Sequence, residues 1–343
     1  MKTDRRSLRI VADDRIPYLQ GQAERMGTVS YLPGAAISQA DVADADVLIV
    51  RTRTRCDRAL LEGSRVRFVA TATIGYDHID TDYLAEAGIA WANCPGCNAS
   101  SVGQYVATSL LRLAEAGYVR LDGCCVGIVG VGHVGTAVDR AVQTLRCQTL
   151  LCDPPRAAAE GSGGFVSMEE VYERADVITY HVPLVRDGHW PTCHMADFQR
   201  MKRRPVLINA ARGEVVDNMA LLAALDSGQV RAAVVDTWEG EPAISLPLLR
   251  RVFIGTPHIA GYSADGKATA TRMALEAVAR HFGFDIRFDI QPPALPADIV
   301  PAADPFVRML QLYDPLTDTA RLKAEPGRFE YLRGHYPLRR EHF

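Results

Sequence analysis

The 343-residue sequence lacks any uninterrupted apolar run long enough to cross a bilayer. The N-terminal residues contain no apolar core of the kind found in signal peptides, and they lead directly into a strand-like segment. Strong charge of one sign is also missing, because the formal net charge is -3 and Lys and Arg are scattered. These absences predict a cytoplasmic protein that binds neither membrane nor nucleic acid.

Cysteine is too sparse, at eight residues, to form a disulfide scaffold. Cys94 and Cys97 have C-x-x-C spacing, but a zinc site needs a second such pair, and only the adjacent Cys124 and Cys125 exist. A thioredoxin-like motif would open a helix directly from a strand near the N-terminus, whereas this one lies deep in the chain. We therefore predict reduced, structural cysteines and no metal site.

What the sequence does contain is a glycine-rich turn between a strand pattern at 125–129 and a helical pattern at 136–145. In that context G-x-G-x-x-G indicates a dinucleotide site. Gly130 permits the tight turn, Gly132 lets the backbone approach a pyrophosphate, and Gly135 lets the helix pack closely on the strand. The alternative is a glycine-rich turn that binds nothing.

The start of the following helix offers free N–H groups to the phosphates, so His133 and Val134 are also expected to bind the cofactor. Asp153 lies about twenty positions after the glycines, at the end of the next apolar run. Its carboxylate can bind a ribose diol and repel a 2′-phosphate. The sequence therefore predicts NAD in preference to NADP.

Strand and helix patterns alternate along most of the chain, which predicts an α/β protein with parallel sheets. Strands are expected at 8–12, 47–50, 68–71, 89–92, 125–129, 149–152, 177–181, 206–209 and 232–236. Helical stretches are expected at 18–26, 58–61, 168–174, 197–201, 218–226, 268–282, 306–313, 318–323 and 328–340. Ser101 and Gln104 have the spacing of a capping box that opens a further helix through Ala114.

Three polar residues, Arg212, Glu241 and His258, follow strands on the expected ligand edge of the nucleotide-binding sheet. A guanidinium can hold a substrate carboxylate through two hydrogen bonds. An imidazole can take a hydroxyl proton as hydride leaves C2, and a neighbouring carboxylate fixes its tautomer and stabilises the imidazolium. The set suits oxidation of a 2-hydroxy acid, although each residue alone could be a surface charge or a structural histidine.

The segments that carry these residues resemble the D-2-hydroxyacid dehydrogenase family. They are GIVGVGHVG at 127–135, INAARGEVVD at 208–217, DTWEGEP at 236–242 and GTPHIAGYS at 255–263. Finer segments, such as PGCN at 95–98, DPPR at 153–156 and HVPLVRDGHWPTCH at 181–194, narrow the resemblance to one branch with a phosphorylated substrate. The resemblance runs from about residue 8 to 290 and returns weakly at 327–340.

The resemblance implies NAD-dependent oxidation of a small phosphorylated 2-hydroxy acid by a homodimer. Arg212 and Glu241 match active-site residues, and His258 matches the proton donor and acceptor. Further cofactor contacts are implied at Asp153, Val182, Ala210, Ala211, Arg212, Asp236 and Gly261. Substrate contacts are implied at Thr52, Thr73 and Tyr262.

The fold that follows is a Rossmann-type, doubly wound NAD-binding domain, 99–265, inserted into a smaller flavodoxin-like substrate domain. The substrate domain is discontinuous and is formed by 1–98 and 266–289. Residues 290–343 begin with a proline-rich link and are expected to form a shortened dimerisation module, or else a frayed tail.

Arg51 and Arg53 flank Thr52 and could bind the substrate phosphate, or they could be solvated charges at a strand end. Arg339 and Arg340 could reach the site of a neighbouring subunit. Two other functions stay open: a dehydrogenase for phosphoglycerate, glycerate or glyoxylate, and an NAD-sensing protein of the transcriptional corepressor type.

Overall fold

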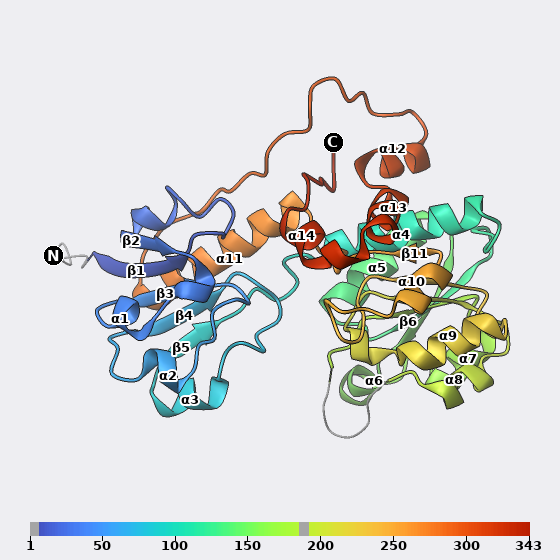
Figure 1. Cartoon of the computed structure of the whole chain (residues 1–343), viewed down its shortest axis with the longest axis horizontal. Coiled ribbons are helices and arrows are strands. Elements are labelled where there is room, and N and C mark those ends of the chain that lie inside the picture. The colour runs from blue at the N-terminus through green and yellow to red at the C-terminus, as the bar shows by residue number, and fades with distance from the viewer. Residues whose placement is uncertain (1–6, 185–191) are drawn as a thin grey trace. The chain divides into compact units, whose positions relative to one another are not determined.

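The computed structural model describes residues 7–184 and 192–343, so the central part of the segment at 181–194 lies outside the described residues (Figure 1). The chain forms two compact units. Unit 1 comprises Met1–Asn98 and Ala264–Ala294, and unit 2 comprises Ala99–Ser263 and Leu295–Phe343. The last segment, 295–343, thus packs with unit 2 and is not a body of its own.

Unit 1 is built on a five-stranded parallel sheet with the order β2-β1-β3-β4-β5. The strands are β1 Leu8–Asp13, β2 Gly27–Leu32, β3 Val47–Val50, β4 Phe68–Thr71 and β5 Ala90–Ala92. The helices are η1 Ala23–Arg25, η2 Gly34–Ala36, α1 Gln39–Val42, α2 Arg58–Leu61, α3 Thr81–Glu86 and α11 Ala264–Phe282. Every residue of β3 and β4 is buried, because successive side chains enter the cores on opposite faces of the sheet.

The start of unit 1 differs from the prediction. Residues 18–26 contain only the 3-10 turn η1 in place of a helix, and the edge strand β2 was not predicted. The strand has a glycine first and polar residues within it, so its hydrophobic pattern is weak. Gly27 is required by packing, since a Cβ there would lie 2.0 Å from the carbonyl oxygen of Leu8 on β1.

Unit 2 contains a six-stranded parallel sheet with the order β11-β10-β9-β8-β6-β7. Its strands are β6 Cys125–Val129, β7 Gln148–Cys152, β8 Val177–Tyr180, β9 Val206–Asn209, β10 Ala232–Val235 and β11 Ile254–Gly255. The chain runs from β6 outward to β7 and then returns to the other side of β6 with β8. The strand order therefore reverses at the carboxyl end of β6, where doubly wound sheets bind their ligands.

Helices cover both faces of this sheet. They are α4 Ala99–Glu115, α5 His133–Thr144, α6 Pro154–Glu160, α7 Met168–Arg174, α8 Met195–Arg200, η3 Gly213–Val215, α9 Asn218–Asp226 and α10 Leu246–Arg251. On β9, Val206 and Ile208 face the core that contains α4 and α5, whereas Leu207 faces the core that contains α7 to α10. Both cores consist mainly of apolar side chains packed closely together, which makes the sheet a rigid base for the loops at its carboxyl edge.

The C-terminal segment of unit 2 contains α12 Pro305–Leu312, α13 Pro315–Ala324, η4 Pro326–Arg328 and α14 Phe329–Gly334. Leu322 and Phe329 are 0% and 1% exposed and belong to the core on one face of the sheet, while Tyr313 belongs to the core on the other. The helix predicted over 328–340 ends at Gly334, and Pro337 lies in the irregular chain that follows.

The predicted capping box at Ser101 is wrong, because α4 already begins at Ala99. The Ser101 hydroxyl instead bonds to the hydroxyl of Ser263 and to Glu341, at 2.6 Å each. The Gln104 amide donates to the carbonyl oxygen of Arg340 at 2.9 Å. Both side chains therefore attach the C-terminal segment to α4.

All eight cysteines are free and buried. Burial raises the pKa of Cys94 and of Cys97 to about 12, so both remain thiols at neutral pH. Among the described residues no helix is both long and apolar enough to span a membrane.

Candidate active site

Six parallel strands of unit 2 end at one edge of its sheet, and each is followed by a residue singled out from the sequence. In sheet order these are His258 and Tyr262 after β11, Asp236 and Glu241 after β10, Ala210, Ala211 and Arg212 after β9, Val182 after β8, Gly130 and Gly132 after β6, and Asp153 after β7. The strand order thus places the expected cofactor loop and the expected catalytic residues on the same edge.

His258 and Glu241 form a direct pair. Nδ1 of His258 lies 2.8 Å from Oε2 of Glu241, and the two side chains are 27% and 17% exposed. The other oxygen of Glu241 accepts a hydrogen bond from the backbone N–H of Trp238 at 2.9 Å. The carboxylate is therefore held from both sides, and it fixes the orientation of the imidazole ring.

The charge state of Glu241 follows from its neighbours. Burial raises its pKa, but the hydrogen bond and charge of His258 outweigh this, with help from the Trp238 N–H and from Arg333. The net effect is a pKa below the usual value, so Glu241 is a carboxylate at neutral pH. A carboxylate in this position stabilises a positive charge on the imidazole.

Asp236 braces the loop that carries His258. Its carboxylate, 1% exposed, accepts from the Thr256 hydroxyl at 2.6 Å and from the N–H groups of Ile259 and Ala260 at 2.7 and 2.9 Å. Its carbonyl oxygen accepts from the N–H of His258 at 2.8 Å. His258 has a positive φ of 55°, a conformation that persists only where the surroundings impose it. Contact of Asp236 with the cofactor stays a prediction.

Arg212 lies in the next loop along the sheet. Its carbonyl oxygen accepts from the Asn209 side chain at 3.0 Å, and its guanidinium donates to the carbonyl oxygen of Ala211 at 2.8 Å. The acceptor of this guanidinium hydrogen bond is the neighbouring residue Ala211, and not Glu241 or His258. The adjacent Gly213 packs tightly against the chain after β10, since a Cβ there would lie 2.0 Å from the carbonyl oxygen of Trp238.

The glycine loop has the shape that a pyrophosphate requires. Gly130 has a φ of +86°, and a Cβ there would lie 2.6 Å from the carbonyl oxygen of His181. A Cβ on Gly135 would lie 2.0 Å from the carbonyl oxygen of Gly130. At Gly132 the opposite holds, because a Cβ would meet nothing within 4 Å. The loop is therefore packed against protein at two glycines and open at the third, directly before α5 begins at His133 and Val134.

Asp153 connects this loop to β7. One carboxylate oxygen caps α6 by accepting from the Arg156 N–H at 3.0 Å, and the other accepts from the Val131 N–H at 2.8 Å. A carboxylate has about four acceptor positions, so two remain for the hydroxyls of a ribose. Burial lowers the pKa of His181 to about 3, and its Nδ1 has no partner within the described part of the chain. This neutral ring and the adjacent Val182 complete a set that fits NAD.

The expected substrate residues are divided between the units. In unit 1, Thr52 follows β3 and is exposed, whereas the Thr73 hydroxyl donates to the carbonyl oxygen of Gly75 at 2.8 Å. Arg51 is held by the buried Asp13 at the end of β1, through contacts of 3.2 and 3.4 Å. In unit 2, Tyr262 accepts a hydrogen bond at 3.2 Å from Nε of Arg333.

In the C-terminal segment one predicted role is wrong, and one residue near the catalytic pair was not predicted. Arg339 is 3% exposed and donates to Gln104, Ser101 and Ile259, so the hypothesis that it reaches a neighbouring subunit is wrong. Arg333 was not singled out, yet its Nη1 lies 3.9 Å from Oε2 of Glu241. The weak return of the resemblance at 327–340 was the available signal.

The fold and the glycine loop are those of a dinucleotide-binding protein, and similarity to known proteins identifies the class as the NAD-dependent D-2-hydroxyacid dehydrogenases. Residues 103–260 match the family model described as D-isomer specific 2-hydroxyacid dehydrogenase, NAD binding domain. A putative enzyme of that kind from Polaromonas superposes with a TM-score of 0.66, at 20% identity over 81% of this chain and 98% of its own. D-lactate dehydrogenase from Aquifex aeolicus, solved with NAD and lactic acid, gives 0.62 at 22% identity, over 80% and 96%.

Curated relatives specify the family further. Erythronate-4-phosphate dehydrogenase from Bacteroides thetaiotaomicron is 49% identical over 338 residues, which is 97% of each protein. The enzyme of that name from Cronobacter sakazakii is 44% identical over 97% of this chain and 92% of its own. The chain belongs to the erythronate-4-phosphate dehydrogenase family, and its cofactor is NAD.

Replacing Gly132 by valine tests the open side of the glycine loop. Since the protein leaves this space empty, the variant should unfold at the parent temperature but bind NADH at least about tenfold more weakly, because the side chain occupies the position of the pyrophosphate. Fluorescence titration with NADH measures the affinity. Gly163→Val, at another open glycine, is the matched control, and equal affinities of the two variants would contradict the assignment.

Proposed function

We propose that the protein oxidises 4-phospho-D-erythronate to 3-hydroxy-2-oxo-4-phosphobutanoate, a step in pyridoxal 5′-phosphate (vitamin B6) biosynthesis. The observation that carries the proposal is the His258–Glu241 pair, on the same sheet edge as the glycine loop. Support for the substrate comes from relatives named erythronate-4-phosphate dehydrogenase, which are up to 49% identical over 97% of the chain.

His258 acts as the general base of the oxidation. With Nδ1 engaged by Glu241, Nε2 takes the proton of the C2 hydroxyl while the C2 hydride leaves with its electron pair. Bound NAD supplies the nicotinamide ring that accepts this hydride. Glu241 stabilises the imidazolium that forms, and the proton later passes to water.

Arg212 binds the substrate carboxylate in this proposal. Its guanidinium can turn from the Ala211 carbonyl oxygen to a carboxylate, which offers a stronger, charge-assisted bond with two contacts. Thr52, Thr73 and Tyr262 are the proposed substrate contacts. For the phosphate we propose Arg51, whose bond to the buried Asp13 fixes its position at the end of β3.

Initial rates of NADH formation test the reaction and its base together. The protein should oxidise 4-phosphoerythronate with a kcat/KM at least about a hundredfold above that for 3-phosphoglycerate or glycerate, because specific polar groups reject analogues that do not match them. His258→Ala should lower kcat by about a hundredfold or more and leave NADH binding intact.

A preference for 3-phosphoglycerate would instead favour the other dehydrogenase function. NAD binding without turnover of any hydroxy acid would favour an NAD-sensing protein. Near-parent turnover of His258→Ala would refute the general base.

We also propose that the protein is cytoplasmic and forms a homodimer. Eight free thiols fit a reducing compartment. Apolar side chains lie exposed along the C-terminal segment, as a dimerisation module requires: Ile299, Val300, Val307, Tyr331, Leu338 and Phe343.

Sedimentation velocity should therefore give about twice the chain mass of 37.5 kDa at micromolar concentration, because the exposed apolar surface is buried between two copies. A single species with the mass of one chain would refute the homodimer.

A further inference from the structure

The C-terminal segment of unit 2 extends to the catalytic pair of the same chain. Arg333, on α14, donates from Nε to the Tyr262 hydroxyl at 3.2 Å, and its Nη1 lies 3.9 Å from Oε2 of Glu241. The same Nη1 lies 3.9 Å from Oε1 of Glu330, on its own helix. One guanidinium thus connects an expected substrate contact with the carboxylate that orients the catalytic histidine.

Charge and burial give this contact its strength. The Arg333 side chain is 27% exposed and that of Glu241 is 17% exposed, so water screens their attraction less than it would at the surface. An arginine N–H can only donate, which makes the Tyr262 oxygen the acceptor in their hydrogen bond. Arg333 therefore fixes the position of the phenol oxygen and favours the charged form of Glu241.

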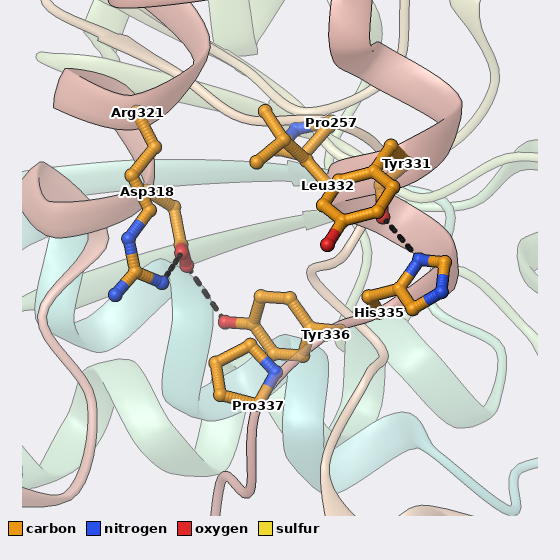
Figure 2. Close-up of a pocket in the computed structure, with 8 residues that line it drawn as sticks. All are labelled: Pro257, Asp318, Arg321, Tyr331, Leu332, His335, Tyr336 and Pro337. Atoms are coloured by element: carbon orange, nitrogen blue, oxygen red, sulfur yellow. Dashed lines mark hydrogen bonds and ion pairs between the residues drawn. The ribbon is translucent and has the colours of Figure 1, made fainter.

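The segment that carries Arg333 contacts the loop of His258 and Tyr262. A small pocket of about 50 Å³ lies between α13, α14 and Pro257, the residue before His258 (Figure 2). Beside it the Tyr336 hydroxyl donates to Asp318 at 2.7 Å (Figure 2). The Tyr336 ring meets the Tyr262 ring edge-on, 6.0 Å between centroids. The segment is thus packed directly on the catalytic loop.

We propose that Arg333 is a positioning residue of the active site, which holds Tyr262 for the substrate and places a positive charge beside Glu241, the partner of His258. The inference rests on the proposed function and deepens it, because it makes the C-terminal segment part of the catalytic apparatus. Arg333 acts through Tyr262 on substrate binding and through Glu241 on the proton transfer.

Arg333→Met removes the charge and keeps much of the side-chain volume. We expect KM for 4-phosphoerythronate to rise about tenfold, since one charge-assisted hydrogen bond is lost, and kcat to fall several-fold. Arg333→Lys should recover part of both. Arg328→Met is the matched control: it removes a surface arginine of the same segment, paired with Glu325, and should change neither constant.

Two further measurements distinguish a positioning role of Arg333 from a role in protein stability alone. In a Tyr262→Phe background, Arg333→Met should add little to KM, because the interaction it removes is already lost. Removal of the cation also raises the pKa of Glu241, whose other charged neighbour is His258. Activity is lost on acidification when the His258–Glu241 pair takes up a proton, because the general base must be unprotonated, and this loss should therefore begin at a higher pH in Arg333→Met than in the parent. NADH affinity should match that of the parent.

Parent values of KM and an unshifted pH profile in Arg333→Met would overturn the inference while leaving the proposed function intact. The inference would also be overturned if the effects of Tyr262→Phe and Arg333→Met on KM multiply when the two substitutions are combined. If the unaltered protein fails to oxidise 4-phosphoerythronate, the proposed function falls, and this inference falls with it.

Discussion

The active site depends on a buried carboxylate that does no chemistry in the proposed reaction. Asp236, at the end of β10, accepts three hydrogen bonds from the loop after β11 and thereby fixes the backbone on both sides of the catalytic histidine. A carboxyl group buried this deeply is tolerated only when both of its oxygens are hydrogen-bonded, as they are here. The same bonds hold His258 at a positive φ and direct its ring to Glu241.

The rest of unit 2 makes that brace possible. Two apolar cores clamp a parallel sheet whose strands all end on one edge, so short loops suffice to place the glycine turn, Asp153, Arg212, Glu241 and His258. The C-terminal segment completes the arrangement from the same unit. Its apolar residues enter both cores, and its buried Arg339 holds α4 and the carbonyl oxygen of Ile259, next to the catalytic histidine.

Local patterns in the sequence were sufficient for the elements with a clear apolar run or well-marked ends. The buried strands 47–50, 68–71, 125–129 and 206–209 and the helices 168–174 and 218–226 have the predicted bounds. The edge strand β2 was missed because its side chains are partly exposed and polar. The helix expected at 18–26 was wrong for a related reason, since tertiary packing leaves only one 3-10 turn there.

Residues of the candidate site that belong to a local sequence motif could be predicted. Residues whose role depends on a contact between distant segments could not. The pairing of His258 with Glu241 was expected from residue types at strand ends. The bracing contacts of Asp236, the burial of Arg339 and the reach of Arg333 depend on segments tens or hundreds of residues apart. Nothing in a single sequence states which of several arginines in a short helical segment will face the catalytic loop.

The central claim is that Glu241 serves the reaction through His258. A double-mutant cycle on kcat, with Glu241→Gln and His258→Ala singly and together, tests it most directly. The account predicts a large loss for each single variant, and for the double variant a kcat close to that of His258→Ala alone. Losses that multiply in the double variant would show that Glu241 acts independently of the histidine and would contradict the account.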